Sequence, residues 1–120
     1  FLDLAGAPIP ADIQGVSLLP LLRGEHPKKW RNDIYYHYPE YPAEHAVKRH
    51  YGIRTERYKL MHFYNDIDVW ELYDLQTDPN ELHNLYGQPG MEKVTKQLMK
   101  RLKQLQIQYD DPILEKYPIK

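Results

Sequence analysis

Cysteine is absent from the 120-residue sequence. A disulfide, a thiolate metal site and a cysteine nucleophile are therefore excluded within it. Long apolar runs are absent too: no stretch is long enough to cross a bilayer, and the sequence opens at Phe1 without the charged and apolar regions of a signal peptide. Because the opening FLDLAG is typical of the last turn of a helix, we expect the chain to be a piece of a longer protein.

An excess of charge of one sign is also missing. The sequence has 16 Lys and Arg against 17 Asp and Glu, and its formal net charge is −1. Balanced charge argues against a general nucleic-acid or membrane-surface binder. Hydrophobic residues make up 42% of the chain, which argues against overall disorder, and the length is enough for one compact domain with a core.

Four short segments rich in aromatic and β-branched residues predict strands, which span residues 33–38, 46–55, 58–64 and 70–75. The links between them are short, and the tightest consists of Glu56 and Arg57. Short links favour antiparallel neighbours, because parallel pairing needs a long crossover connection.

A long amphipathic helix is predicted after the strands. Five apolar residues recur at spacings of three and four with lysines between them: Met91, Val94, Leu98, Leu102 and Leu105. A shorter helix is predicted at 17–24, which Ser17 can cap. The residues thus predict an α+β fold, with a four-stranded antiparallel sheet packed by one long C-terminal helix and a short N-terminal helical segment.

The stretch WELYDLQTDPNELHNL concentrates side chains that could bind a metal or shape a turn: Glu71, Asp74, Asp78, Glu81 and His83. Residues 78–81 are typical of a helix start, in which Asp78 accepts hydrogen bonds from free backbone N–H groups and Glu81 reaches back. Acids on a strand alternate sides, so they would not converge on an ion. We interpret the cluster as a cap, and Asp66 and Asp68 as part of a hairpin tip.

Four segments in chain order resemble formylglycine-dependent sulfatases. They match the family patterns LDLAG, QG-x-SLLPLL, G-[IV]-RT-x-x-YKL and ELYDL…DPxE…NL, at residues 2–6, 14–22, 52–60 and 71–85. The last pattern stands near the end of these enzymes. The likeness extends from Phe1 to about Tyr109, and four patterns in the same order are more specific than any one of them.

The resemblance implies a larger enzyme related to alkaline phosphatase, whose N-terminal domain carries the formylglycine, the calcium and most of the sulfate pocket. It implies a C-terminal subdomain with the same sheet and helix that the residues predict. Formylglycine is made from Cys or Ser within (C/S)-x-P-x-R, and the only serine, Ser17, stands in SLLPLL without that pattern. We therefore expect no catalytic residue, metal or cofactor in this chain.

The expected organisation has three parts. Residues 1–30 would form an N-terminal segment packed on the missing large domain, residues 31–110 the antiparallel sheet and C-terminal helix, and residues 111–120 a flexible tail. The expected partners are the N-terminal catalytic domain of the same polypeptide and a sulfated carbohydrate, and neither nucleic acid nor a membrane. The residues leave the compartment open, and a periplasmic or secreted parent is expected.

Substrate-binding residues are predicted in the basic segment at the second strand: His45, Lys48, Arg49 and His50. Their side chains donate hydrogen bonds to oxyanions, as recognition of a sulfated glycan requires. Alternation along a strand places Lys48 and His50 on one face and Arg49 on the other. His50 is the foremost candidate, as a contact to a sugar hydroxyl. The alternatives are a partly buried His50 satisfied by the backbone, and a solvated strand face for Lys48 and Arg49.

The resemblance implies that the parent hydrolyses sulfate esters on carbohydrates of glycosaminoglycan type, and that this chain contributes structure and part of the substrate pocket without activity of its own. Two alternatives stay open. One is a stand-alone carbohydrate-binding module that uses the basic strand and the tyrosines between Tyr35 and Tyr41. The other is the equivalent subdomain of a related phosphodiesterase.

Overall fold

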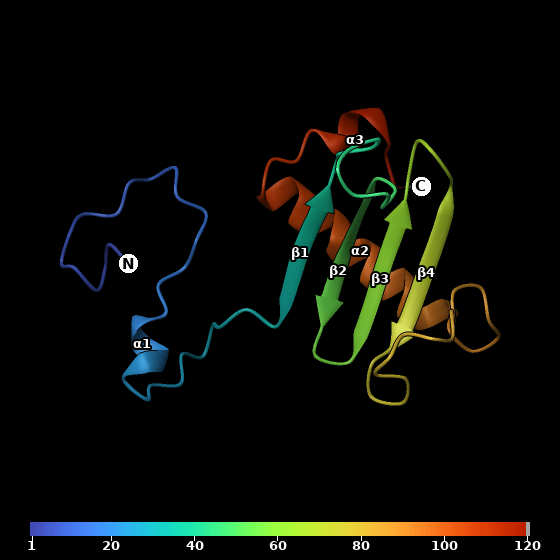
Figure 1. Cartoon of the computed structure of the whole chain (residues 1–120). Helices are drawn as coiled ribbons and strands as arrows, with labels where there is room; N and C mark the ends of the chain where they lie inside the picture. The colour runs from blue at the N-terminus through green and yellow to red at the C-terminus, as the bar shows by residue number, and fades with distance from the viewer. Residues whose placement is uncertain (120) are drawn as a thin grey trace. The chain divides into compact units, whose positions relative to one another are not determined.

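The computed structural model describes residues 1–119. The chain divides into two compact units, Phe1–Arg31 and Asn32–Lys120. The first unit contains one short helix, and the second contains a sheet that a long helix covers on one side (Figure 1). The predicted α+β class and its elements are confirmed in the second unit.

The helix of the first unit, α1, covers Leu19–Leu22 and is shorter than the predicted 17–24. The N-cap residue is Leu18 rather than the predicted Ser17, and α1 has no side-chain cap; the Ser17 hydroxyl, one position earlier, accepts a hydrogen bond from the backbone N–H of Leu19 at 3.1 Å. The same hydroxyl donates to the Asp3 carboxylate at 2.5 Å. Turns and extended chain make up the rest of this unit.

The second unit is built on four antiparallel strands in the order β1-β2-β3-β4. Their bounds are Asp33–Tyr38 for β1, His50–Thr55 for β2, Tyr58–Phe63 for β3 and Val69–Asp74 for β4. Each strand pairs with the next one along the chain, as the short links predict. The second strand begins at His50 rather than at residue 46, because the preceding residues form the long loop after β1.

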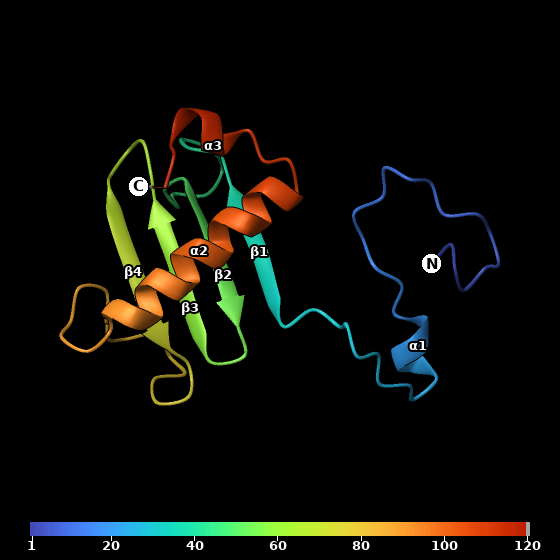
Figure 2. The same cartoon turned by 180° about the vertical axis from the view of Figure 1, so that it is seen from behind.

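One face of the sheet packs against helix α2, which covers Glu92–Gln108 and crosses the sheet diagonally (Figure 2). On the strands, every second side chain points into this interface, and on α2 the side chains that point into it recur every three or four residues. The two sets together form one core. Its buried members on the strands and on α2 are Tyr51, Ile53, Leu60, Leu72, Leu98, Leu102 and Leu105. Among the described residues 1–119, no helix has the length and apolar character needed to cross a membrane.

The acidic stretch after β4 forms a loop, so the predicted helix start is wrong. Asp78 does accept backbone N–H groups, that of His83 at 2.7 Å, and the N–H groups of Leu82 and His83 lower the pKa of its carboxyl. Glu81 does not reach back to the start of the turn. It adopts a left-handed φ of 56°, and its carboxylate lies 2.5 Å from the Lys59 ammonium.

The acids of this stretch do not converge on a metal. Glu71 accepts a hydrogen bond from the Tyr73 hydroxyl at 2.9 Å, and Asp74 forms an ion pair with Arg57 at 2.7 Å. Asn84 ties the loop to β4, since its side-chain oxygen accepts the backbone N–H of Leu72 at 3.0 Å. Within residues 1–119 there is no group of three or more His, Cys, Asp or Glu side chains that could hold a metal ion.

The chain after α2 returns to the sheet. A short helix, α3, covers Ile113–Lys116. Asp111 accepts hydrogen bonds from the Tyr35 hydroxyl at 2.6 Å and lies 2.8 Å from Nδ1 of His37, both on β1. Ile113 is 5% exposed. These contacts fix the start of the region from residue 111 onward against the sheet, while its predicted flexibility stays a prediction.

Candidate functional site

The basic segment that the sequence singles out lies at the start of β2, at one end of the sheet. His50 is the first residue of β2 and pairs with Tyr38 of β1 and Phe63 of β3. Because side chains alternate along β2, and Tyr51 faces α2 in the core, His50 lies on the face of the sheet opposite to α2.

The His50 ring is held by one hydrogen bond to the backbone and by the aromatic rings around it. Its Nδ1 lies 2.8 Å from the carbonyl oxygen of Lys48. Rings of Tyr36, Tyr38 and Phe63 surround it, with centroids 6.0, 5.6 and 5.2 Å away. A carbonyl only accepts, so Nδ1 carries the proton, and Nε2 of the neutral ring is an acceptor. Among residues 1–119, Nε2 has no hydrogen-bond partner, so it is the atom available to a ligand.

Lys48 and Arg49 are both engaged with the loop after β1. The Lys48 ammonium lies 3.8 Å from the centroid of the Tyr41 ring, a cation–π contact, and donates to its hydroxyl. Arg49 donates to both carboxylate oxygens of Asp66 at 2.9 and 3.1 Å and to the carbonyls of Pro39 and Tyr41. The structure therefore gives Arg49 a bracing position between two loops, and Lys48 a position over an aromatic ring.

His45 lies in the exposed part of the same loop. No contact brings it to the other three predicted residues among those the structure describes. The four predicted site residues therefore form a connected group of three, Lys48, Arg49 and His50, with His45 apart.

The open face of the sheet contains one feature that sequence reasoning missed. Tyr36 lies directly over Gly52, its partner on β2: a methyl group on residue 52 would lie 2.6 Å from the ring carbon Cζ of Tyr36 and 2.7 Å from the carbonyl oxygen of Leu60. Gly52 therefore admits the tyrosine ring, because it has no side chain of its own in the space that the ring fills. The Tyr36 hydroxyl is buried with no hydrogen-bond partner among residues 1–119, and burial raises its pKa.

Comparison with known proteins places this arrangement in a family. The family described as N-sulphoglucosamine sulphohydrolase, C-terminal, matches residues 1–108. An N-acetylglucosamine-6-O-sulfatase of Bacteroides thetaiotaomicron is 57% identical over 113 residues, which cover 92% of this chain and 20% of that protein. The chain thus spans about a fifth of the length of this relative.

Solved structures agree with the sequence match. One, described as a complex with its substrate D-glucosamine-2-N,6-O-disulfate, has a TM-score of 0.88 and 55% identity, covering 92% of this chain and 23% of the other. A 2-O glycosaminoglycan sulfatase has a TM-score of 0.79 and 32% identity, again covering 92% and 23%. A phosphonate monoester hydrolase from Silicibacter pomeroyi has a TM-score of 0.75 and 26% identity, covering 94% and 24%.

These matches run through the sheet, the covering helix and the N-terminal segment, and they agree with the four sequence patterns in the same order. The chain belongs to the family of sulfatase C-terminal domains described as N-sulphoglucosamine sulphohydrolase, C-terminal.

Proposed function

We propose that this chain is the C-terminal part of an enzyme that hydrolyses sulfate esters on amino sugars of glycosaminoglycan type. The observation that carries the proposal is the family match over residues 1–108 together with 57% identity to an N-acetylglucosamine-6-O-sulfatase. A preceding domain of the same polypeptide would hold the formylglycine and the calcium, which supply the nucleophile and the charge stabilisation for attack on sulfur. Among residues 1–119 there is no cluster of side chains that could hold a metal ion, and the serine of this sequence does not stand in (C/S)-x-P-x-R, the pattern from which formylglycine is made.

The role of this chain in that enzyme is to form one wall of the sugar pocket, with His50 as the contact. Its bond to the Lys48 carbonyl fixes the tautomer, so neutral His50 presents a lone pair on Nε2 to a sugar hydroxyl. The surrounding rings hold the imidazole in one orientation. Lys48 adds positive charge for a sulfated sugar, and Arg49 keeps the two loops in place.

Kinetics of the complete polypeptide test this role. His50→Ala should raise KM for glucosamine 6-sulfate by about tenfold, the value of one lost hydrogen bond to a bound ligand. Turnover of a small aryl sulfate, which has no sugar hydroxyls, should stay unchanged. His83→Ala is the matched control, because the His83 side chain is 79% exposed and lies in the loop after β4. An equal loss of activity on both substrates would show that His50 is not a contact to the sugar.

The N-terminal unit is proposed to pack on the preceding domain. Its nine exposed large apolar side chains have too few partners within the unit: Phe1, Leu2, Leu4, Ile9, Ile13, Val16, Leu18, Leu21 and Leu22. A surface of this kind marks an interaction site. Hydrogen exchange should be fast over residues 1–31 in the isolated chain and slow in the complete polypeptide. Strong protection across this unit in a monomer of the isolated chain would contradict the proposal.

A phosphonate or phosphodiester hydrolase is the second candidate, since a phosphonate monoester hydrolase shares the fold at a TM-score of 0.75. The complete polypeptide should release sulfate from glucosamine 6-sulfate faster than it cleaves an aryl phosphonate monoester. The reverse preference would favour the second candidate.

A further inference from the structure

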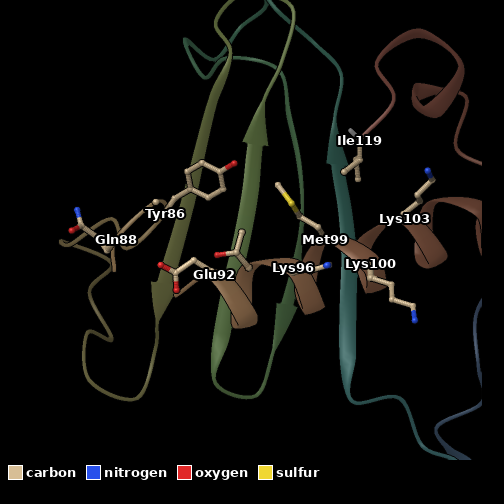
Figure 3. Close-up of a pocket in the computed structure, with 10 residues that line it drawn as sticks. Tyr86, Gln88, Glu92, Lys96, Met99, Lys100, Lys103 and Ile119 are labelled. Carbon is tan, nitrogen blue, oxygen red and sulfur yellow. The ribbon is translucent and has the colours of Figure 1, made fainter. Parts of the chain in front are cut away.

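A groove runs beside α2, on the face of the sheet that carries the helix. Its volume is about 590 Å³, and it is lined by the loop after β4, by α2 and by the chain after α3, including Tyr86, Gln88, Met99 and Ile119. Figure 3 shows Tyr86, Met99 and Ile119 beside the helix, with Lys100 and Lys103 further along it. A second hollow of about 580 Å³ shares Tyr86, Met99 and Ile119 with the first. We call the two together the α2 groove.

Aromatic rings form a continuous stack in the α2 groove. The His62 and Trp70 rings lie 4.2 Å apart at an interplanar angle of 7°, and Trp70 and Tyr86 lie 5.8 Å apart at 16°. Trp70 therefore stands between two parallel rings, and Tyr86, at the end of the stack, lines both hollows. A half-exposed tyrosine in such a position has a flat apolar ring for the C–H face of a sugar and a hydroxyl for its polar edge.

Lysines give the α2 groove a positive side. Lys96, Lys100 and Lys103 follow one flank of α2 at spacings of four and three, and Lys116 lines the second hollow. None of them is in an ion pair with a carboxylate among residues 1–119. Two acids line the groove as well: Glu92, one helical turn before Lys96 on α2, and Asp68, whose carboxylate lies 2.7 Å from Nε2 of His62. A groove that is lined by a flat ring and by ammonium groups without a carboxylate partner matches a ligand with sulfate groups on a sugar chain.

We infer that the α2 groove is a second glycan site, which binds a sulfated oligosaccharide through Tyr86 and the lysines of α2. For the class of ligand this inference rests on the proposed function. The groove lies on the helix side of the sheet, whereas His50 lies on the opposite face, so the groove would hold a different stretch of a polymeric substrate from the one in the pocket. Two linked contacts retain a polymer on the enzyme more strongly than the pocket alone.

Titration of the complete polypeptide with a heparin-derived decasaccharide tests the inference. Lys100→Ser with Lys103→Ser should weaken Kd by about fivefold at low salt and reduce the dependence of Kd on salt concentration. Lys93→Ser is the matched control, because Lys93 is an exposed lysine of the same helix outside the groove lining, and it should change Kd less than about twofold. Tyr86→Ala should weaken Kd without changing the salt dependence.

The lysine pair decides the outcome even where Tyr86→Ala disturbs folding, since exposed lysines on α2 can be replaced without loss of packing. An unchanged Kd for the pair, or an equal change for Lys93→Ser, would overturn the inference, as would a groove occupied by the preceding domain. KM for glucosamine 6-sulfate should stay at the wild-type value in all three variants. If the wild type does not hydrolyse that sugar at all, the proposed function fails, while the decasaccharide titration still reports on the groove.

Discussion

The two units of the chain use similar apolar side chains in opposite ways. In the unit Phe1–Arg31 no residue is buried, and its leucines and isoleucines are largely exposed. In the second unit the residues of the same types lie between the sheet and α2, and Leu60, Leu72 and Leu102 are fully buried. A core needs two layers that face each other, and only the second unit has them. The first unit has apolar surface without a second layer, which is why we assign its partner to the rest of the polypeptide.

Replacing one leucine in each unit should give the largest contrast. Leu102→Ala removes a fully buried side chain and should lower the free energy of unfolding by about 3 kcal/mol, the usual cost of such a cavity. Leu22→Ala, at a side chain that is 73% exposed, should cost less than about 0.5 kcal/mol in the isolated chain. Urea unfolding measures both.

The same pair sharpens the comparison in the complete polypeptide. There Leu22→Ala should cost roughly 2 kcal/mol, because the preceding domain would bury the side chain. Equal costs for Leu22→Ala in the two settings would break the assignment of the first unit to an interface.

A glycine pair gives the next contrast. Gly52→Ala places a methyl group 2.6 Å from the Tyr36 ring and 2.7 Å from the Leu60 carbonyl, so it should cost about 2 kcal/mol through overpacking. Gly15→Ala in the first unit meets nothing closer than 3.8 Å and should be neutral. Thermal unfolding separates the two variants, and a neutral Gly52→Ala would mean that Tyr36 does not lie over the strand.

The smallest expected effect is on the stability of the fold at acidic pH. Burial alone would raise the pKa of Asp111, but the Tyr35 hydroxyl, the backbone N–H of Ile113 and the neighbouring His37 lower it. A lowered pKa in the folded state means that Asp111 stabilises the fold above the ordinary carboxyl pKa of 3.8, and that this stability is lost as the pH falls through the lower folded value. Asp111→Asn should therefore flatten the fall of the urea midpoint below about pH 4. A midpoint that falls as steeply in this variant would contradict the role of Asp111.

Much of this fold follows from pattern alone. Alternation along the strands and the three-and-four spacing of Leu98, Leu102 and Leu105 predict the sheet, its antiparallel order and the covering helix, because these periodicities arise from burial on one face. The structure of the stretch around Asp78 was harder to predict from the sequence. Its capping acceptor is real, but the Lys59–Glu81 ion pair joins residues 22 positions apart and draws the chain into a loop. Local sequence does not contain that contact.

The candidate site shows the same limit. Sequence reasoning could place Lys48, Arg49 and His50 together, but it could not tell which of these side chains is already bound to other residues of the fold. The Arg49–Asp66 pair depends on the β3–β4 hairpin, which comes back beside the start of β2 only in the folded sheet. The α2 groove was missed for the same reason, since its lining comes from four segments separated in the chain: the β3–β4 hairpin, the loop after β4, α2 and the last residues from Lys116.

Sulfate release from glucosamine 6-sulfate tests the central claim most directly, measured for the complete polypeptide and for the 120-residue chain by itself. The account predicts release by the complete polypeptide and none by the isolated chain, because the role proposed for this chain is to form one wall of the sugar pocket, while the nucleophile is proposed to lie in the preceding domain. Sulfate release by the isolated chain would contradict it.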